Sequence, residues 1–320
     1  MKILVFGAGV IGSTYAWQLS EAGYDVMMFI RKHRMVRYSH SGISINCTDL
    51  RGKKESFFST VFRPKTIDRL EPKQAFDLII VCLKNFQLQD AVPYIAKYSG
   101  NAHILFLGTI WHEFKLIEHH IPRARVLYGF PAMAGGGRAE NSITCTLFKN
   151  GNTMLGGAER KSDRTINDIA MVFGKSGMQP KISFRMKHWI KVHCIWKAAS
   201  FGAICKAGNA KAFASAYKAV KHSVLAIKEG LIVANREQVR AWTIFPFTLF
   251  YLPSFIITFL LKKSYKEEML EVTERHMKHG FDEMKKQYYD ILNDGKKHHI
   301  NMSYWQSYEA HILKAENTRN

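Results

Sequence analysis

Residues 2–12 read KILVFGAGVIG, and this stretch decides the fold of the first half of the chain. A short apolar run, 2–6, is followed by three glycines in the spacing GxGxxG. Between Ser13 and Ala22 the apolar residues recur at helical spacing, and a second apolar run covers 26–30. The pattern predicts a strand, a tight glycine turn, a helix and a second strand.

The three glycines predict a dinucleotide site. Gly7 permits the tight turn, Gly9 lets the backbone approach a pyrophosphate, and Gly12 lets helix and strand pack closely. The phosphates then lie at the first N–H groups of the helix, around Val10 and Ile11, where the helix dipole favours an anion. We expect these five residues to contact a cofactor; the alternative is a glycine turn that binds no ligand.

The end of the second strand indicates which dinucleotide binds. An NAD site expects an acidic residue there, whereas the 2′-phosphate of NADP needs a cation. The residues present are Arg31, Lys32 and, slightly further on, Arg34, while Asp25 precedes the strand and lies at its wrong end. A guanidinium can hold a phosphate with several hydrogen bonds, so we expect Arg31 and Lys32 to select NADP(H). The alternative is a solvated basic turn.

The chain of 320 residues carries a formal charge of +20, and 47% of its residues are hydrophobic. Its length suffices for two domains with their own cores. The lysines and arginines are scattered and form no nucleic-acid module, so we expect no nucleic-acid partner. We interpret the charge as a positive potential that gathers a phosphorylated cofactor and a carboxylate substrate; surface solubility alone is the alternative.

Two features bear on localisation. The five cysteines are odd in number and lack CxxC spacing, which is typical of thiols in a reducing cytosol. Because the sequence leads directly into an expected core strand, we expect no signal peptide. We therefore expect a cytoplasmic protein.

Residues 241–261 are uncharged and long enough to cross a bilayer, but Pro246 and Pro253 interrupt them. We expect a buried helix pair or a homodimer interface there, with a membrane-surface contact as a lesser alternative and no membrane span.

Strand and helix signals alternate through the first half of the chain. Nearly continuous apolar runs at 77–83, 102–107, 125–129 and 144–148 are typical of strands buried on both faces of a parallel sheet. After about residue 180 the patterns become long and helical. We therefore predict an α/β domain with a doubly wound parallel sheet of Rossmann type over 1–180 and an all-helical domain over 181–320, with a linker near Lys175–Ile182.

The segments GAGVIGSTYAWQLSEAGYDVMMFIR (7–31) and DLIIVCLKNFQLQDAV (77–92) resemble the N-terminal half of ketopantoate reductases, also called 2-dehydropantoate 2-reductases. The resemblance covers roughly residues 1–130. In that family a strand-end Leu-Lys followed by an aromatic residue and a glutamine borders the cofactor. The resemblance therefore implies that Leu83, Lys84 and Gln87 contact it; a solvent-facing loop lysine is the alternative for Lys84.

The resemblance also implies a fold and a reaction. A Rossmann domain would be followed by a helical domain like that of 6-phosphogluconate dehydrogenases, used for substrate binding and dimerisation. The reaction would be hydride transfer from NADPH to the keto carbon of a 2-oxo acid. Such a reaction needs a proton donor for the developing alkoxide and a group that orients the carboxylate, and the family uses a lysine and a carboxylate for these roles.

The chain departs from the family at the expected catalytic positions. Leu107-Gly108 stands where the family has Asn-Gly, and no gap-free alignment fits both of its patterns, Trp-x-Lys and Val-Asn, onto residues 187–197, where Trp189 can take the lysine's place. Lys187, Lys191 and His193 are therefore rival candidates for the proton donor. His193 can instead replace an asparagine and simply form hydrogen bonds.

Near the C-terminus, Asp282-Glu283-Met284 matches a glutamate-containing family pattern, in a helix expected from about Tyr265 to Leu292. Glu283 is the candidate for orienting the substrate; the alternative is an exposed helix glutamate. His276 and His279 can share its face, but the order of a metalloprotease helix is absent, and we expect no metal.

Three functions remain open. The first is an NADPH-dependent reductase of a small 2-oxo acid. The second is an NADP-binding relative that has lost this chemistry and acts as a sensor or scaffold, an alternative based on Leu107 and Trp189. The third is a dehydrogenase of another substrate class, such as an imine or an alcohol.

Overall fold

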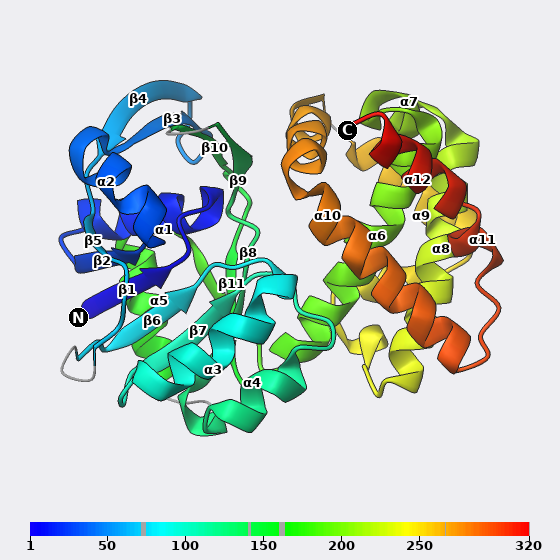
Figure 1. The fold of residues 1–320 in the computed structure, drawn as a ribbon. Helices are drawn as coiled ribbons and strands as arrows, with labels where there is room; N and C mark the ends of the chain where they lie inside the picture. The colour runs from blue at the N-terminus through cyan, green and yellow to red at the C-terminus, as the bar shows by residue number, and fades with distance from the viewer. Residues whose placement is uncertain (72–74, 140–141, 160–163, 266, 320) are drawn as a thin grey trace. The chain divides into compact units, whose positions relative to one another are not determined.

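The computed structural model describes residues 1–71, 75–139, 142–159, 164–265 and 267–319. Within these ranges the side chains of residues 33, 34, 36, 37, 39, 267–269, 275, 276 and 278 are not described. The chain forms two compact units, Met1–Lys187 and His188–Asn320 (Figure 1). The division of roles into a cofactor domain and a substrate or dimerisation domain stays a prediction.

The first unit contains an eight-stranded sheet in the order β12-β11-β8-β7-β6-β1-β2-β5. All neighbouring pairs are parallel except β11 and β8, which are antiparallel. The strands are β1 (Lys2–Phe6), β2 (Asp25–Phe29), β5 (Lys65–Ile67), β6 (Leu78–Val81), β7 (His103–Leu107), β8 (Val126–Pro131), β11 (Thr153–Gly157) and β12 (Pro180–Ile182). The helices of this unit are α1 (Val10–Glu21), α2 (Lys32–Ser41), η1 (Asn85–Gln87), α3 (Leu88–Tyr98), α4 (Phe114–His120), η2 (Arg123–Arg125) and α5 (Arg164–Lys175).

The Rossmann-type fold class is confirmed, but one strand prediction and the linker prediction are wrong in detail. The run at 144–148 belongs to β10 (Ser142–Leu147), which lies in a separate sheet. The expected linker near Lys175–Ile182 contains β12, an edge strand of the large sheet. Periodicity shows that a segment is extended, but it does not show which sheet the segment joins.

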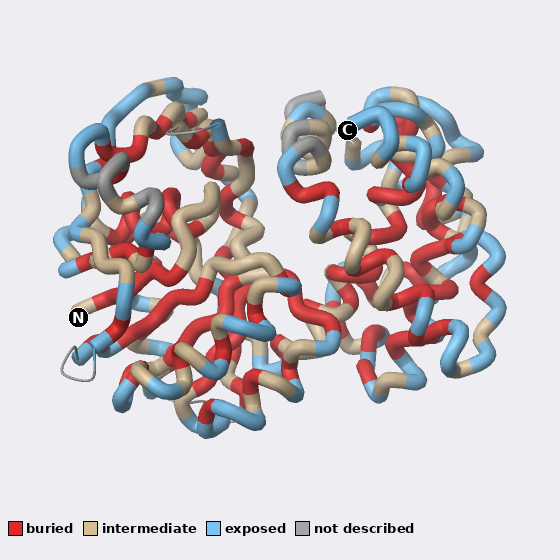
Figure 2. The backbone as a smooth tube through the Cα atoms, viewed as in Figure 1, coloured by how far each residue is buried: buried red, intermediate tan, exposed pale blue. Residues whose placement is uncertain are grey.

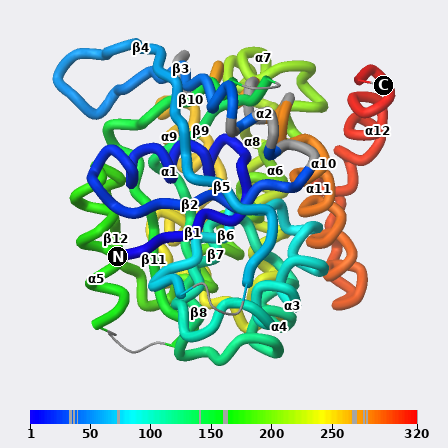
Figure 3. The backbone as a smooth tube through the Cα atoms, turned by 60° about the vertical axis from the view of Figure 1, so that its left-hand side comes forward, coloured from blue at the N-terminus to red at the C-terminus, as the bar shows by residue number. Residues whose placement is uncertain are grey.

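A second sheet of four strands has the order β4-β3-β10-β9, with β3 (Ile43–Asp49), β4 (Ser56–Phe62) and β9 (Ala134–Arg138) beside β10. Helix α1 packs against β1 and β2 of the large sheet and against β9 and β10 of the small one, so it lies between the two sheets (Figure 3). The side chains of β1 point alternately to the two faces of the large sheet, so the strand contributes to the packing on both faces. Ile3 and Val5 join the core with α1 and α5, while Phe6 on the opposite face stacks on Phe29 and contacts Tyr94 of α3.

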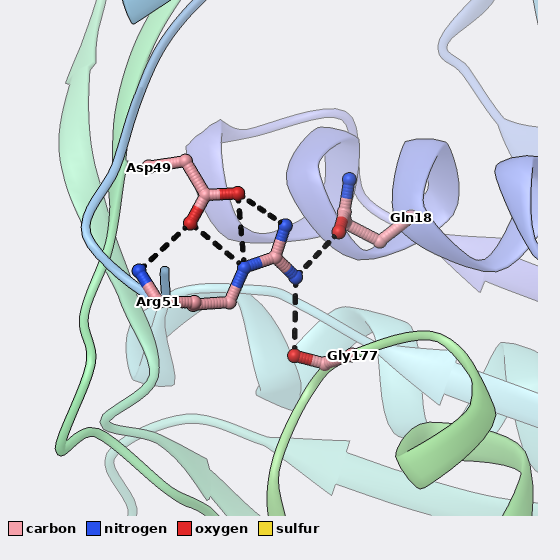
Figure 4. A network of polar contacts seen from close by, with 4 residues as sticks. All are labelled: Gln18, Asp49, Arg51 and Gly177. Atoms are coloured by element: carbon pink, nitrogen blue, oxygen red, sulfur yellow. Dashed lines mark hydrogen bonds and ion pairs between the residues drawn. The ribbon is translucent and has the colours of Figure 1, made fainter. Parts of the chain in front are cut away.

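Arg51, just after β3, ties three segments of this unit together (Figure 4). Its guanidinium makes a forked pair with Asp49, with Nη2 2.6 Å from Oδ2 and Nε 2.9 Å from Oδ1. Its Nη1 donates to Oε1 of Gln18 in α1 at 2.8 Å and to the carbonyl of Gly177 at 3.1 Å. The arginine therefore holds α1 and the turn before β12 against the end of β3.

The second unit is helical, as predicted. Its elements are α6 (Met186–Ala207, which begins in the first unit), α7 (Ala210–Ser215), α8 (Tyr217–Arg236), η3 (Ala241–Thr243), η4 (Phe247–Tyr251), α9 (Ser254–Ser264), α10 (Glu267–Lys297), α11 (Ser303–Gln306) and α12 (Glu309–Asn317). The buried residues of this unit lie along its centre (Figure 2). Tyr288 of α10 stacks on Trp305 of α11, and the buried Glu229 of α8 accepts the backbone N–H groups of Tyr304 and Trp305. This carboxylate satisfies donors at the start of α11.

The apolar stretch 241–261 forms η3, η4 and most of α9. The expectation of a buried helix pair is wrong, because Phe245, Phe255 and Phe259 are 75%, 63% and 64% exposed. Among the helices that the structure describes, none combines the length and the hydropathy needed to cross a membrane.

Candidate functional site

The glycine turn lies where the order of the large sheet reverses. Strand β1 is flanked by β2 on one side and by β6 on the other, so the carboxyl ends of β1 and β6 meet at the turn. Gly7 has a φ of +119°, and a Cβ there would collide with the carbonyl of Cys82 after β6. A Cβ at Gly12 would collide with the carbonyl of Gly7. Both glycines are therefore required by the fold itself.

Gly9 is different. A Cβ added there would meet no protein atom within 4 Å, so neither packing nor a positive φ requires glycine at this position. Gly9 is also the N-cap of α1, where no side chain caps the helix and no acidic residue stands in the first turn. The N–H groups of Val10 and Ile11 begin this helix. The turn thus combines open space with the positive end of a helix dipole, which suits a phosphate group.

The loop after β6 borders the same edge of the sheet. The N–H of Lys84 donates to Oε1 of Gln87 at 3.1 Å, and the N–H of Gln87 donates to the carbonyl of Lys84 at 2.9 Å. Gln87 therefore fixes the shape of the loop, and the part-buried Leu83 and Lys84 are held beside the glycine turn by a 2.9 Å hydrogen bond from the N–H of Cys82 to the carbonyl of Phe6. The ammonium of Lys84 lies 5.6 Å from the centre of the Phe86 ring.

Asn85 in this loop was not singled out by sequence reasoning. It is 1% exposed, and its Oδ1 accepts the N–H of Phe86 at 2.8 Å. Its Nδ2 has no hydrogen-bond acceptor among the described residues. A buried amide donor without an acceptor is unusual, so Asn85 joins the candidates for cofactor contact.

The basic residues after β2 lie at the carboxyl end of that strand. Arg31 is the N-cap of α2 and Lys32 its first residue, and both are exposed. Asp25 lies at the opposite end of β2 and binds Lys65 at 2.7 Å, an exposed pair whose hydrogen bond lowers the pKa of the aspartate. Asp25 is thus paired with Lys65 at the other end of β2. The side chain of Arg34 lies outside the described residues.

Arg138 is a further cation at the turn that sequence reasoning missed. It ends β9 in the small sheet, and its guanidinium contacts the carbonyl oxygen of Ala8 inside the glycine turn. The guanidinium also lies 5.6 Å from the centre of the Tyr38 ring of α2. No short-range spacing links residue 138 to residue 8. The glycine run 135–137 is the only sequence signal, since it allows close backbone approach.

Lys187, the first rival for the proton donor, forms an ion pair with Glu118 in the first unit. Oε1 of Glu118 also accepts the hydroxyl of Tyr128 at 2.9 Å, and Nε of Arg123 lies 3.5 Å from Oε2. Burial, together with the nearby Glu118 carboxylate, raises the pKa of Tyr128. Lys187 therefore serves an ionic cluster that ties the end of this unit to α4.

His193 and Lys191 lie on α6 in the second unit. The His193 ring stacks on Trp189 at 4.7 Å and 9°, and its edge contacts are with Trp196 and Phe247. Burial, with Lys197 nearby, lowers the pKa of His193 to about 3, so its imidazole is neutral near pH 7. Trp189 is thus a stacking partner of His193.

Lys191 has a polar setting instead. Its Nζ lies 3.9 Å from Oε2 of Glu237, whose Oε1 accepts from Nε2 of His298 at 2.7 Å. The hydrogen bond from His298, with a further contribution from Lys191, lowers the pKa of Glu237 although partial burial opposes it. Lys191 therefore belongs to a polar cluster with Glu237 and His298, and its side chain is 14% exposed.

Glu283 lies in α10, which confirms the expected helix, with ends at Glu267 and Lys297. It is part-buried, and Nε2 of the fully buried Gln287 lies 3.5 Å from its Oε1. The side chain of His276 is outside the described residues. Among the groups that are described, no cluster of His, Cys, Asp and Glu could hold a metal ion.

Leu107, which the resemblance places where an asparagine is expected, is a core residue. It is 3% exposed at the end of β7, and a Cβ at Gly129 of β8 would collide with its side chain. The N–H of Gly108 donates to the carbonyl of Gly129 at 3.1 Å. The leucine thus contributes packing where an amide would contribute hydrogen bonds.

Comparison with known proteins gives matches over much of the chain. Residues 3–159 match the family model described as ketopantoate reductase PanE/ApbA. The 2-dehydropantoate 2-reductase of Pyrococcus abyssi (strain GE5 / Orsay) is 24% identical over 205 residues, 62% of each chain. The uncharacterized oxidoreductase YkpB of Bacillus subtilis (strain 168) is 32% identical over 103 residues, 31% of each chain. The chain thus spans about three fifths of the length of the first relative and less than a third of the second.

Solved structures match over nearly the whole chain. A ternary structure of D-mandelate dehydrogenase with NADH and anilino(oxo)acetate has a TM-score of 0.77 at 17% identity and covers 100% of this chain and 99% of that one. The crystal structure of 2-dehydropantoate 2-reductase from Geobacter metallireducens GS-15 has a TM-score of 0.74 at 18% identity, covering 98% and 100%. At these identities the matches show a shared fold.

Proposed function

Because residues 3–159 match the family model described as ketopantoate reductase PanE/ApbA, we propose that the chain belongs to this family and is an NADPH-dependent reductase of a small 2-oxo acid, similar to 2-dehydropantoate 2-reductase. The observation that carries the proposal is the glycine turn. Open space beside Gly9 adjoins an uncapped helix N-terminus at the point where the sheet order reverses. Ligands of such sheets bind at this point, outside the carboxyl ends of the strands.

The proposed preference for NADP(H) over NAD(H) rests on charge. Arg31 and Lys32 are exposed at the end of β2, where the adenosine ribose lies in Rossmann folds, and Asp25 is engaged with Lys65 at the other end. The D-mandelate dehydrogenase structure was determined with NADH, so NADH is the competing cofactor to test. Gly7, Gly9, Val10, Ile11 and Gly12 would hold the diphosphate, with Arg138 adding positive charge beside Ala8. Leu83, Lys84, Asn85 and Gln87 would border the remainder of the cofactor.

When bound, the nicotinamide supplies the hydride. The chain must orient the keto acid and give a proton to the alkoxide oxygen that develops. Lys191 is the preferred proton donor among the three rivals, because its Nζ lies 3.9 Å from Glu237, a looser ion pair than the one between Lys187 and Glu118. His193 is neutral and stacked between aromatic rings. The carboxylate of Glu237 lies beside Lys191 in this arrangement. Glu283 is proposed to orient the substrate from α10, and the positive charge of the chain would attract the substrate carboxylate.

A cofactor-linked sensor or scaffold is the less favoured function, since the matched relatives are named as reductases, an oxidoreductase and a dehydrogenase. A reductase of imines or alcohols differs from the proposal only in the substrate. We also propose that the chain forms a homodimer and is located in the cytoplasm.

The deciding experiment follows NADPH absorbance while the purified chain is mixed with a panel of 2-oxo acids, including 2-dehydropantoate. The proposal expects saturable oxidation with at least one of them. If NADPH binds and quenches its fluorescence but no 2-oxo acid is reduced, the sensor function replaces the proposal. If cyclic imines or simple ketones are reduced instead, the third function does.

A further inference from the structure

The stretch 241–261 exposes large apolar side chains on the second unit. We define its aromatic face as Trp242 of η3, Phe245, Tyr251 of η4, and Phe255 and Phe259 of α9, all of which are exposed. Single exposed apolar residues are ordinary on protein surfaces, but five aromatic rings within eighteen residues are not. This face belongs to the second unit, whereas the glycine turn belongs to the first.

The rings belong to one local structure. Phe255 and Phe259 are four residues apart in α9 and share a face of the helix, whereas Ile257 and Thr258 on the other side are buried. Helix α9 packs against α8 and η4, and η3 packs against η4 and α8. The buried side of α9 thus fixes the helix on α8 and leaves the phenylalanines outward.

Cations accompany the aromatic face. Lys262 and Lys263, both exposed, form the last turn of α9, and Lys263 follows Phe259 by four residues, so it continues the same helix face. Between residues 169 and 266 the sequence has sixteen lysines and arginines but only two acids, Glu229 and Glu237. Glu229 is buried on backbone N–H groups and Glu237 binds His298, so both of these acids have partners outside the aromatic face.

This charge pattern distinguishes between two apolar partners for the aromatic face, a second copy of the chain and a lipid bilayer. In a symmetric dimer the same patch meets itself, so its positive charge would be brought together from two copies, with no acid between 238 and 265 to offset it. A bilayer containing anionic lipids offers the complementary charge. Aromatic rings are favoured at the level of the lipid headgroups, and lysines beside them can reach the phosphates.

We propose that the aromatic face docks the second unit on an anionic lipid surface. The rings of Phe245, Phe255 and Phe259 would enter the headgroup region, and Lys262 and Lys263 would contact the lipid charges. No helix crosses the bilayer in this arrangement; apolar contact and electrostatic attraction together hold the protein reversibly at the interface.

The test is co-sedimentation of the full chain with phosphatidylcholine vesicles, with and without phosphatidylserine. Wild-type protein should bind the anionic vesicles and be released by salt, because salt screens surface charges. Phe255→Ser/Phe259→Ser should weaken binding roughly tenfold or more through lost apolar contact. Lys262→Gln/Lys263→Gln should weaken it roughly thirtyfold, about a factor of five per lysine.

Leu313→Ser provides the matched control, since Leu313 is an exposed apolar residue of α12 outside the aromatic face. It should bind as wild type does, and all variants should keep the same melting temperature. Equal binding to neutral and anionic vesicles, or no loss in either double variant, overturns the proposal. So does a dimer in light scattering that dissociates in Phe255→Ser/Phe259→Ser, which would identify the face as a contact between copies. None of these outcomes alters NADPH oxidation, so the reductase proposal is judged separately.

Discussion

The guanidinium of Arg138 contacts the carbonyl oxygen of Ala8, so a cation from the small sheet lies against the glycine turn at the end of β1. The two residues are 130 positions apart. Strand β9 reaches the turn because α1 packs between the two sheets. The small sheet thus adds positive charge at the place where the helix dipole already favours an anion.

Arg138→Gln should weaken NADPH and NADH binding alike, because the diphosphate is common to both. We expect a loss of about 1.5–3 kcal/mol, the range for hydrogen bonds to charged groups, measured by calorimetric titration. Arg69→Gln, at a surface pair with Glu71, is the control and should bind normally. Unchanged affinity for both nucleotides in Arg138→Gln would remove this residue from the site.

Arg31→Ala should act selectively. It should weaken the binding free energy of NADPH by about 1.5–3 kcal/mol, which raises the Kd for NADPH. The Kd for NADH should change little, since only NADPH carries the 2′-phosphate. The ratio of the two dissociation constants is the measurement. A parallel loss for both nucleotides would contradict the phosphate assignment.

Arg51→Gln should destabilise the first unit, because it leaves the part-buried carboxylate of Asp49 without its forked partner. We expect a decrease of about 1.5–3 kcal/mol in the free energy of unfolding by urea at pH 7. Burial alone would raise the pKa of Asp49, but hydrogen bonds from Arg51 outweigh it and lower the pKa. The stabilisation is therefore present above the unfolded pKa of about 3.9 and is lost as the pH falls through the lowered folded value. A difference between wild type and Arg51→Gln that stays constant down to pH 3 would contradict this account.

His193 should remain neutral in the folded protein throughout the physiological range. Its folded pKa of about 3 lies below the unfolded value of about 6.5. As the pH falls below 6.5 the unfolded chain takes up a proton that the folded chain does not, so the free energy of unfolding decreases. In His193→Phe this decrease should be smaller, as followed by urea unfolding between pH 7 and pH 4. Protonation of the His193 ring near pH 6.5, seen by NMR, would contradict the prediction and restore His193 as an acid catalyst.

Lys191→Gln and Glu283→Gln should each lower kcat/KM for the 2-oxo acid while leaving the Kd for NADPH unchanged. The reason is that both are proposed to act on the substrate, by proton donation and by orientation respectively. General acid catalysis typically contributes about 10²–10⁴-fold, so the effect of Lys191→Gln should lie in that range. Lys187→Gln is the comparison and should mainly affect stability, since Lys187 pairs with Glu118. A larger catalytic loss in Lys187→Gln than in Lys191→Gln would exchange their roles.

The sequence predicted the local features and missed the long-range ones. The path from β1 through the glycine turn and α1 to β2 follows from spacing within thirty residues, and β6, β7 and β8 follow from continuous apolar runs. The small sheet could not be predicted, because parallel pairing of β3 with β10 joins residues about one hundred positions apart. Arg138 was missed for the same reason. The exposure of Phe255 and Phe259 was mispredicted because periodicity does not reveal whether a neighbouring element covers an apolar helix face.

The central claim is that the turn at Gly7–Gly12 holds a dinucleotide phosphate, and titration of NADPH into wild-type protein and Gly9→Asp tests it most directly. A Cβ at Gly9 meets no protein atom, so the variant should fold with an unchanged melting temperature. Calorimetry should then register saturable heat with wild type and none with Gly9→Asp. Absence of binding to wild type, or equal binding to a folded Gly9→Asp, would contradict the claim.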